Sequence, residues 1–277
     1  MSPKIIIQEG FYMSVRDEIK EQQKKLKGQG FKAHWDYFWE YYKIHTIVAI
    51  VAIIFIGITI RDISNNKPYA MYAMFINNRG MDTQNILQNG FTEYAGIDTE
   101  NYSVIVDTSS NFMSSIVDTT SVATSEKIMA MLAGRDLDVI VADENTFGRY
   151  ASQDTFIDLR TIYSDSELES FGDKIFYVDQ GYIDYLNSEE YTTYITSGEY
   201  DENNRYAVMA KQYEEDFTYQ RMAKEDMADP VPVGFILDNS AALKSCEAYP
   251  EEAPIAGIAI NTQRPDTAMS FIEYLLQ

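Results

Sequence analysis

The stretch "SEKIMAMLAGRDLDVIVADENTFGRYAS", residues 125–152, indicates the fold class. Apolar residues recur at helical spacing over 125–134 and a glycine closes that segment, which predicts a helix. The continuous apolar run 137–143 is typical of a strand that is buried on both faces. Asn145 is then expected to cap a further helix over 145–152. Helix, buried strand and helix in succession indicate an α/β chain.

The same alternation extends in both directions along the chain. Strands and helices are expected on both sides of the opening stretch, at 69–76, 82–96, 102–109, 231–238, 254–261 and 264–276. Strand, helix, strand, helix, strand is the pattern of a parallel sheet with right-handed crossovers. We therefore expect a globular domain, residues 69–277, built on a parallel sheet.

The middle of the chain, residues 179–229, is rich in tyrosine and acidic residues and poor in aliphatic ones. We expect a hairpin followed by a strand over 187–209, and a helix over 211–227. Tyrosine offers a flat apolar face and a hydroxyl group, so Tyr182 and Tyr206 are candidate ligand-binding residues. The alternative is that these tyrosines pack on the core.

An apolar run of 17 residues, Ile44–Ile60, precedes the globular domain. A helix of this length covers about 25 Å, which is the short end of what spans a bilayer. The run has no polar face, unlike a buried core helix, and it lies too far from the start for a signal peptide. It therefore predicts one transmembrane helix over 44–60, followed by a polar tether over 61–68.

Charges and aromatic residues flank the predicted span. Lysines gather before it, and basic residues favour the cytoplasmic side, so we expect a cytoplasmic N-terminus and an extracellular domain at the cell membrane. Residues 1–43 are expected to form a cytoplasmic tail and an interfacial amphipathic helix. Five aromatic residues share one face of this helix and would contact membrane lipid: Phe31, Trp35, Phe38, Trp39 and Tyr42. The alternative is that this face packs on a partner membrane protein.

Composition excludes several functions for the exported part. The chain has a net charge of −21, and residues 61–277 hold 14 basic against 37 acidic residues, so this part should repel nucleic acid. The same residues contain no histidine and one cysteine, Cys246. Ser-His and Cys-His catalysis and ordinary zinc sites are thereby excluded, and no intrachain disulfide can form. We expect no catalytic residue, metal or cofactor; a carboxylate-based hydrolase is the enzymatic alternative.

Polar residues follow three of the predicted strands. Ligands of open α/β sheets gather beyond the carboxyl ends of the strands. The candidate ligand-binding residues at these ends are Asn77, Asn78, Thr108, Ser109, Asp143, Glu144 and Asn145. They suit a small polar ligand, and the alternative is that they are ordinary loop turns and helix caps.

Two segments together resemble the type 2 extracellular solute-binding proteins. "AGRDLDVIVADENTFGRYASQDTFIDL" (133–159) is similar to their first-lobe segment, and "PIAGIAINTQRPDTAMSFIEYLL" (254–276) to their strand and helix with a Phe-Ile-x-x-Leu pattern. The resemblance implies an α/β fold with a periplasmic-binding-protein-like parallel sheet. The chain is shorter than most members, so the second lobe is expected to be abbreviated. The membrane part resembles the N-terminal anchors of small clostridial membrane proteins.

The resemblance implies a function as well. It implies a membrane-anchored extracellular bacterial domain that binds a small polar ligand and presents it to a membrane partner, such as the permease of an ABC transporter. The alternative is a structural or regulatory subunit of a membrane complex, which uses the same fold for protein–protein contact without binding a ligand.

Overall fold

The computed structural model describes residues 20, 24, 30–65, 67–112 and 119–277. The chain divides into two compact units, Met1–Asn66 and Lys67–Gln277. Most of the predicted tail, residues 1–29, lies outside the described residues.

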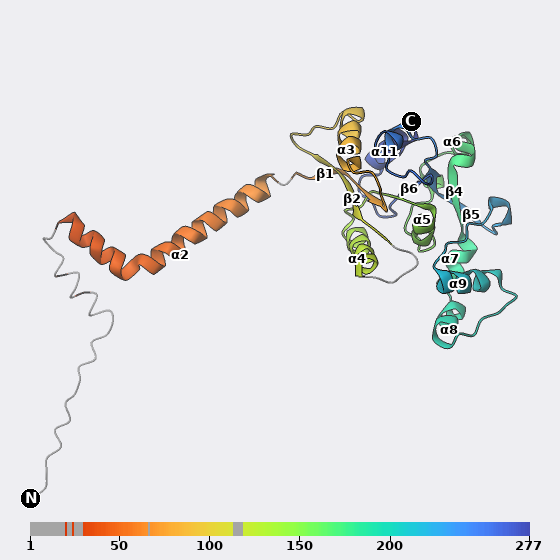
Figure 1. Ribbon diagram of the computed structural model, residues 1–277, viewed down its shortest axis with the longest axis horizontal. Helices are drawn as coiled ribbons and strands as arrows, with labels where there is room; N and C mark the ends of the chain where they lie inside the picture. Colours follow the sequence, from red (N-terminus) through yellow and green to blue (C-terminus); the bar gives the residue numbers. More distant parts are fainter. Residues whose placement is uncertain (1–19, 21–23, 25–29, 66, 113–118) are drawn as a thin grey trace, which may run out of the picture. The chain divides into compact units, whose positions relative to one another are not determined.

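Helix α2, Phe31–Asn65, carries the apolar run. Its segment Tyr42–Ile63 has a mean hydropathy of 2.3, is not buried, and is long and apolar enough to cross a membrane. The helix continues through residues 61–65, which the sequence analysis assigns to a tether. Proline disfavours helical backbone at the residue before it, and the first helix breaker after the apolar run is Pro68. Figure 1 shows that α2 is bent, with a shorter leg at its N-terminal end and a longer leg after it.

The second unit is built on a six-stranded sheet with the order β2-β1-β3-β6-β5-β4. The strands are β1 Tyr69–Ile76, β2 Ser103–Ser110, β3 Val139–Ala142, β4 Ile175–Asp179, β5 Pro230–Ile236 and β6 Ile255–Ile258. β1 is parallel to β2 and to β3, whereas β6, β5 and β4 each pair antiparallel to their neighbour. The α/β class is confirmed, and the predicted parallel arrangement holds for the β2-β1-β3 half of the sheet.

Helices cover both faces of this sheet. The helices described in this unit are α3 Thr83–Tyr94, α4 Thr119–Gly134, α5 Glu144–Ala151, α6 Asp165–Phe171, α7 Gln180–Leu186, α8 Glu189–Ser197, α9 Arg205–Asp216, α10 Ala241–Ser245 and α11 Pro265–Leu276, with short 3-10 helices η1 Leu159–Thr161, η2 Gly172–Lys174 and η3 Lys224–Asp226.

Two fully buried clusters form the core of the domain. Successive side chains of a strand point to opposite faces. Phe75 therefore packs with Phe91 and Phe271 on the face covered by α3 and α11, while Met74 packs with Phe147 on the face covered by α4 and α5. The rings of Phe91 and Phe271 meet edge to face, with centroids 4.9 Å apart.

Helices α7, α8 and α9 form a small group beside β4, which we call the three-helix cluster (Figure 1). It has its own core, built on Tyr182, Tyr185, Ala207 and Ala210. The described part of Lys67–Gln277 contains a single sheet and forms one compact unit, and the abbreviated second lobe stays a prediction.

The hairpin and strand predicted over 187–209 are wrong, because this segment forms α8 and the start of α9. The reason is local capping. The Ser188 hydroxyl accepts a hydrogen bond from the backbone N–H of Tyr191, and the Asn204 side chain accepts one from Tyr206. Such caps satisfy backbone donors that a helix start leaves free. The helix predicted over 211–227 ends at Asp216, where Phe217 takes a left-handed conformation with φ 56°.

Candidate functional site

The carboxyl ends of β1 and β3 meet through Asn77 and Asp143. Asn77 adopts a left-handed conformation with φ 61°, and its Nδ2 donates to Asp143 Oδ2 at 2.7 Å. Asn77 Oδ1 accepts from the backbone N–H of Phe112 at 2.7 Å. Asp143, rather than the predicted Asn145, caps α5, because its Oδ1 accepts from the Thr146 backbone N–H at 2.9 Å. The polar groups of Asn77 and Asp143 are thus already committed to the fold.

The other residues predicted at this edge are dispersed. Asn78 Nδ2 donates to the Gly80 carbonyl at 2.8 Å, and the Ser109 hydroxyl donates to Asp107 at 2.7 Å. A hollow of about 510 Å³ at this edge is lined by Asn77 and Asp143, but Asn78, Thr108 and Ser109 do not line it. Within the described residues, the predicted cluster therefore does not converge on one cavity.

Glu144 and Asn145 hold a distant segment in place instead. Asn145 Oδ1 accepts from the backbone N–H of Tyr219 at 2.5 Å, and its Nδ2 donates to the Phe217 carbonyl at 3.2 Å. Glu144 pairs with Arg221 at 3.2 Å. These contacts fix the segment 217–221 against the start of α5.

Through Tyr219 that segment lines a cavity of about 450 Å³, which we call the tyrosine cavity. It lies among α5, the three-helix cluster and the 217–221 segment, and it is lined by Arg149, Ser152, Gln153, Asp154, Tyr182, Leu186, Asn187, Tyr191, Ala210, Tyr213, Glu214 and Tyr219. Of the residues predicted from sequence it contains Tyr182. Tyr206 lies outside, where its hydroxyl donates to Asp179 at 2.8 Å.

Three tyrosine hydroxyls of this cavity are uncommitted. Tyr191 donates to Glu214 Oε1 at 3.2 Å. Among the described residues, the hydroxyls of Tyr182, Tyr213 and Tyr219 have no hydrogen-bond partner. Burial raises the pKa of Tyr182 and of Tyr219, and it raises the pKa of Tyr191 to about 12. These hydroxyls therefore stay protonated near neutral pH and are available as hydrogen-bond donors and acceptors for a ligand.

Two glycines make room for tyrosines at this site. A Cβ on Gly148 of α5 would lie 2.2 Å from Cδ1 of Tyr219, so the ring rests on the helix backbone. A Cβ on Gly181 of α7 would lie 2.4 Å from the Tyr206 hydroxyl oxygen. Four residues of the cavity are not predicted from the sequence as site residues: Arg149, Tyr191, Tyr213 and Tyr219. A glycine inside a predicted helix, at position 148, was the signal that another group approaches its backbone.

Asp179 joins the two chain segments that lead into and out of the three-helix cluster. Its carboxylate accepts from the backbone N–H groups of Gly181 at 3.1 Å and Ala228 at 3.0 Å. It also pairs with the Arg205 guanidinium at 2.8 Å. Burial alone would raise the pKa of Asp179, but the backbone donors and the Tyr206 hydroxyl together hold it below the ordinary value. One ionised carboxylate thus attaches the cluster to the sheet.

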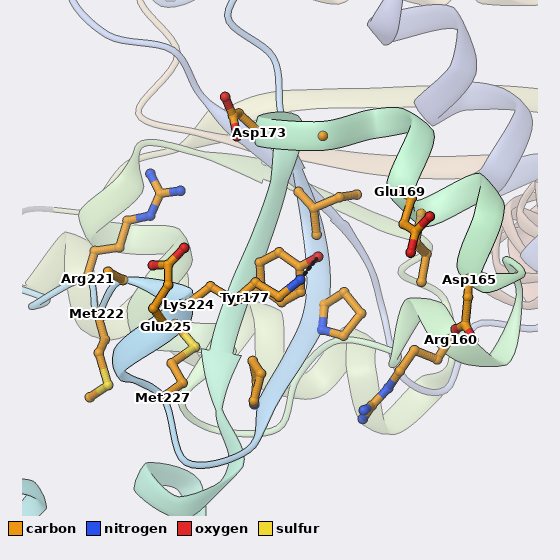
Figure 2. A pocket seen from close by; sticks show the side chains of 16 residues that line it. Arg160, Asp165, Glu169, Asp173, Tyr177, Arg221, Met222, Lys224, Glu225 and Met227 are labelled. Atoms are coloured by element: carbon orange, nitrogen blue, oxygen red, sulfur yellow. Dashed lines mark hydrogen bonds between the residues drawn. The ribbon is translucent and has the colours of Figure 1, made fainter.

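A larger hollow of about 950 Å³ lies over β4 and β5. Figure 2 shows Tyr177 at its centre, with Lys224 and Arg221 from the 221–227 segment on one side and Arg160 on the other. These cations already have partners: Lys224 donates to the Tyr177 hydroxyl at 3.0 Å, Arg160 pairs with Asp158 at 2.7 Å, and Arg221 pairs with Glu144. Its basic groups are thus committed to the fold, whereas its carboxylates, such as Asp173 and Glu225, are exposed and have no partner among the described residues. We therefore take the tyrosine cavity as the better candidate for a small-molecule site.

Comparison with known proteins gives a distant likeness. No family model matches the chain, and no curated protein matches it. The Trichodesmium protein IdiA (FutA), solved in complex with iron and citrate, is 12% identical over 75% of this chain and 81% of its own, with a TM-score of 0.33. The PBP AttC of Agrobacterium tumefaciens C58, in an open unliganded conformation, is 12% identical over 75% of this chain and 79% of its own, with a TM-score of 0.30. Since the likeness is this low, the candidate site rests on the geometry of the present chain.

Proposed function

We propose that this protein is a membrane-anchored binding protein that holds a small polar ligand in the tyrosine cavity. The observation that carries the proposal is the set of three uncommitted tyrosine hydroxyls lining a cavity of about 450 Å³. Small-molecule sites typically measure about 300–1,000 Å³ and combine apolar walls with a few convergent polar groups. The hydroxyls of Tyr182, Tyr213 and Tyr219 are not among the fully buried atoms that lack a partner, so they are open to the cavity, where a ligand or solvent can complete their hydrogen bonds.

The proposed location is the outer face of the cell membrane, with a cytoplasmic N-terminus. Three observations support it: the 22-residue segment Tyr42–Ile63 of α2, which is apolar enough to cross a membrane, the lysines before it, and the excess of acidic residues after it. The bend of α2 in Figure 1 would allow its aromatic leg to lie in the interface while the longer leg spans the bilayer.

The proposed role is non-enzymatic presentation of the ligand to a membrane protein, such as the permease of an ABC transporter. The second candidate is a structural or regulatory subunit that binds a protein partner. The hollow of Figure 2 favours it, because its lining combines the apolar groups of Met222 and Met227 with charged side chains of both signs.

The test is a thermal shift of the full-length protein in detergent against sugars, amino acids, peptides and organic ions. A ligand at a hundredfold excess over its Kd should stabilise the domain by about 2.7 kcal/mol. Tyr182→Phe should weaken binding, since it removes one cavity hydroxyl. Tyr163→Phe is the matched control, because the Tyr163 hydroxyl likewise has no partner among the described residues but lies outside the cavity.

Two results would contradict the proposal. One is that no ligand class raises the melting temperature. The other is that Tyr182→Phe and Tyr163→Phe affect binding equally, because binding would then not involve the cavity. Co-purification of a membrane protein without any ligand response would instead support the subunit function.

A further inference from the structure

Arg149 is a half-buried cation of the tyrosine cavity that has no hydrogen-bond or ion-pair partner among the described residues. It lies in the last turn of α5, and its guanidinium carbon is 4.3 Å from the centroid of the Phe112 ring. No hydrogen bond or ion pair joins this guanidinium to any residue of the described chain. Arg205 and Arg264, by comparison, each pair with an aspartate. In a chain with 43 acidic and 22 basic residues, a cation left unpaired at a cavity wall indicates the place of an anionic ligand group.

Glu214 supplies the opposite charge in the same cavity. It lies on α9 and accepts a hydrogen bond from the Tyr191 hydroxyl. Tyr213 experiences both charges: burial raises its pKa, Arg149 lowers it and Glu214 raises it further. The Tyr213 side chain, which lines the same cavity, is therefore influenced by a positive and a negative group. Asp154 adds a second carboxylate to the lining, so an anion without any positive group would meet net repulsion.

From this juxtaposition we infer that the tyrosine cavity takes a zwitterionic small molecule of the amino-acid type. Its carboxylate pairs with Arg149 and accepts hydrogen bonds from tyrosine hydroxyls, and its ammonium group lies near Glu214 and the tyrosine rings. Guanidinium binds carboxylate in a planar, bidentate way, and aromatic rings attract cations. Leu186 and Ala210 give the remaining wall an apolar character that suits a hydrocarbon side chain. The inference rests on the proposed function, since it names the ligand class of the same cavity.

The experiment separates the two charged groups of the ligand. Calorimetric titration of the full-length protein in detergent uses L-alanine, L-leucine, L-phenylalanine and L-glutamine, each with its decarboxylated amine and its deaminated acid. At least one amino acid should bind, and it should bind at least tenfold more tightly than its amine and its acid. Arg149→Gln should remove the preference over the amine, and Glu214→Gln the preference over the acid.

Two further variants keep the test specific. Arg149→Lys retains the charge but not the bidentate geometry, so it should bind with intermediate affinity and serves where Arg149→Gln does not fold. Arg160→Gln is the matched control, because Arg160 pairs with Asp158 outside the cavity and its replacement should leave the affinity unchanged. An affinity that falls as much in Arg160→Gln as in Arg149→Gln would overturn the assignment of Arg149.

The outcomes distinguish this inference from the proposed function. An amine or an acid that binds as tightly as its amino acid overturns the zwitterion class and leaves a binding protein. The zwitterion class is likewise overturned, and the binding function kept, if no amino acid binds while a sugar, peptide or other ion stabilises the protein and Tyr182→Phe weakens that effect. If no compound of any class binds, the inference and the proposed function both fail.

Discussion

Replacing Gly148 with alanine tests how the tyrosine cavity is built. In an exposed helix position this change stabilises a protein by about 0.5–1 kcal/mol, because glycine loses more backbone entropy on folding. Here the new Cβ would lie 2.2–2.5 Å from three atoms of the Tyr219 ring, so the ring must move. Overpacking of this kind costs about 1–3 kcal/mol. The expected net effect is a loss of about 1–2 kcal/mol, or a melting temperature lower by roughly 2–8 °C for a domain of this size.

The assay is thermal unfolding followed by near-ultraviolet circular dichroism of tyrosine. Both tryptophans of the chain lie in α2, so the tyrosine signal reports mainly on the globular domain. Gly134→Ala is the matched control, because its Cβ would meet only the end of the Asp136 side chain at 3.0 Å, which can move away. The control should melt at the wild-type temperature or slightly above it. A Gly148→Ala protein as stable as wild type would show that Tyr219 does not rest on α5.

Three further predictions concern acid stability, membrane depth and orientation. Burial alone would raise the pKa of Asp107, but Lys127 and Ser109 hold it at about 2, below the ordinary 3.8. The ionised Asp107 carboxylate thus stabilises the fold above about pH 4, and this contribution is lost as the pH falls towards 2. In urea unfolding, Asp107→Asn should therefore lower the free energy of unfolding by about 1–2 kcal/mol at pH 7 and by much less at pH 2.5. An equal loss at both pH values would contradict this. The tryptophans of α2 should be quenched more by nitroxide lipids labelled near the headgroup than by those labelled at the bilayer centre; the reverse order would refute the interfacial position. A cysteine at the exposed Thr196 should react with an impermeant maleimide on intact cells, while the buried Cys246 of wild type should not; labelling only after lysis would reverse the orientation.

The parallel half of the sheet could be predicted because its signal is local. β1, β2 and β3 are apolar runs separated by helices with strong periodicity, and α11 shows its buried face directly in the sequence. The antiparallel half could not be predicted in the same way. β6 pairs with β3 across more than a hundred residues, and no local pattern records the direction of such a pairing. β4 was missed because its short run, Ile175–Asp179, lies next to the tyrosine-rich segment.

The candidate site was predicted only in part, for a related reason. Polar residues at the strand ends, such as Asn77 and Asp143, are expected from the sequence to face a ligand, but the same side chains also suit caps and turns. In the structure Asn77 donates to Asp143, and Asp143 caps α5. The walls of the tyrosine cavity come from positions as far apart as Arg149 and Tyr219. Their convergence depends on where Asn145 anchors the 217–221 segment, which no periodicity reveals.

Among the described residues, polar side chains join the three-helix cluster to the rest of the domain at the carboxylate of Asp179 and at the start of α5, where Asn145 and Glu144 hold the 217–221 segment. Two such points define a pivot axis, and a body fixed along an axis can rock about it while both points keep their bonds. A rocking motion of this kind would change the depth of the space between α5 and α9. The domain would then admit and release a ligand by rearranging side-chain packing, while the hydrogen bonds of the sheet stay intact.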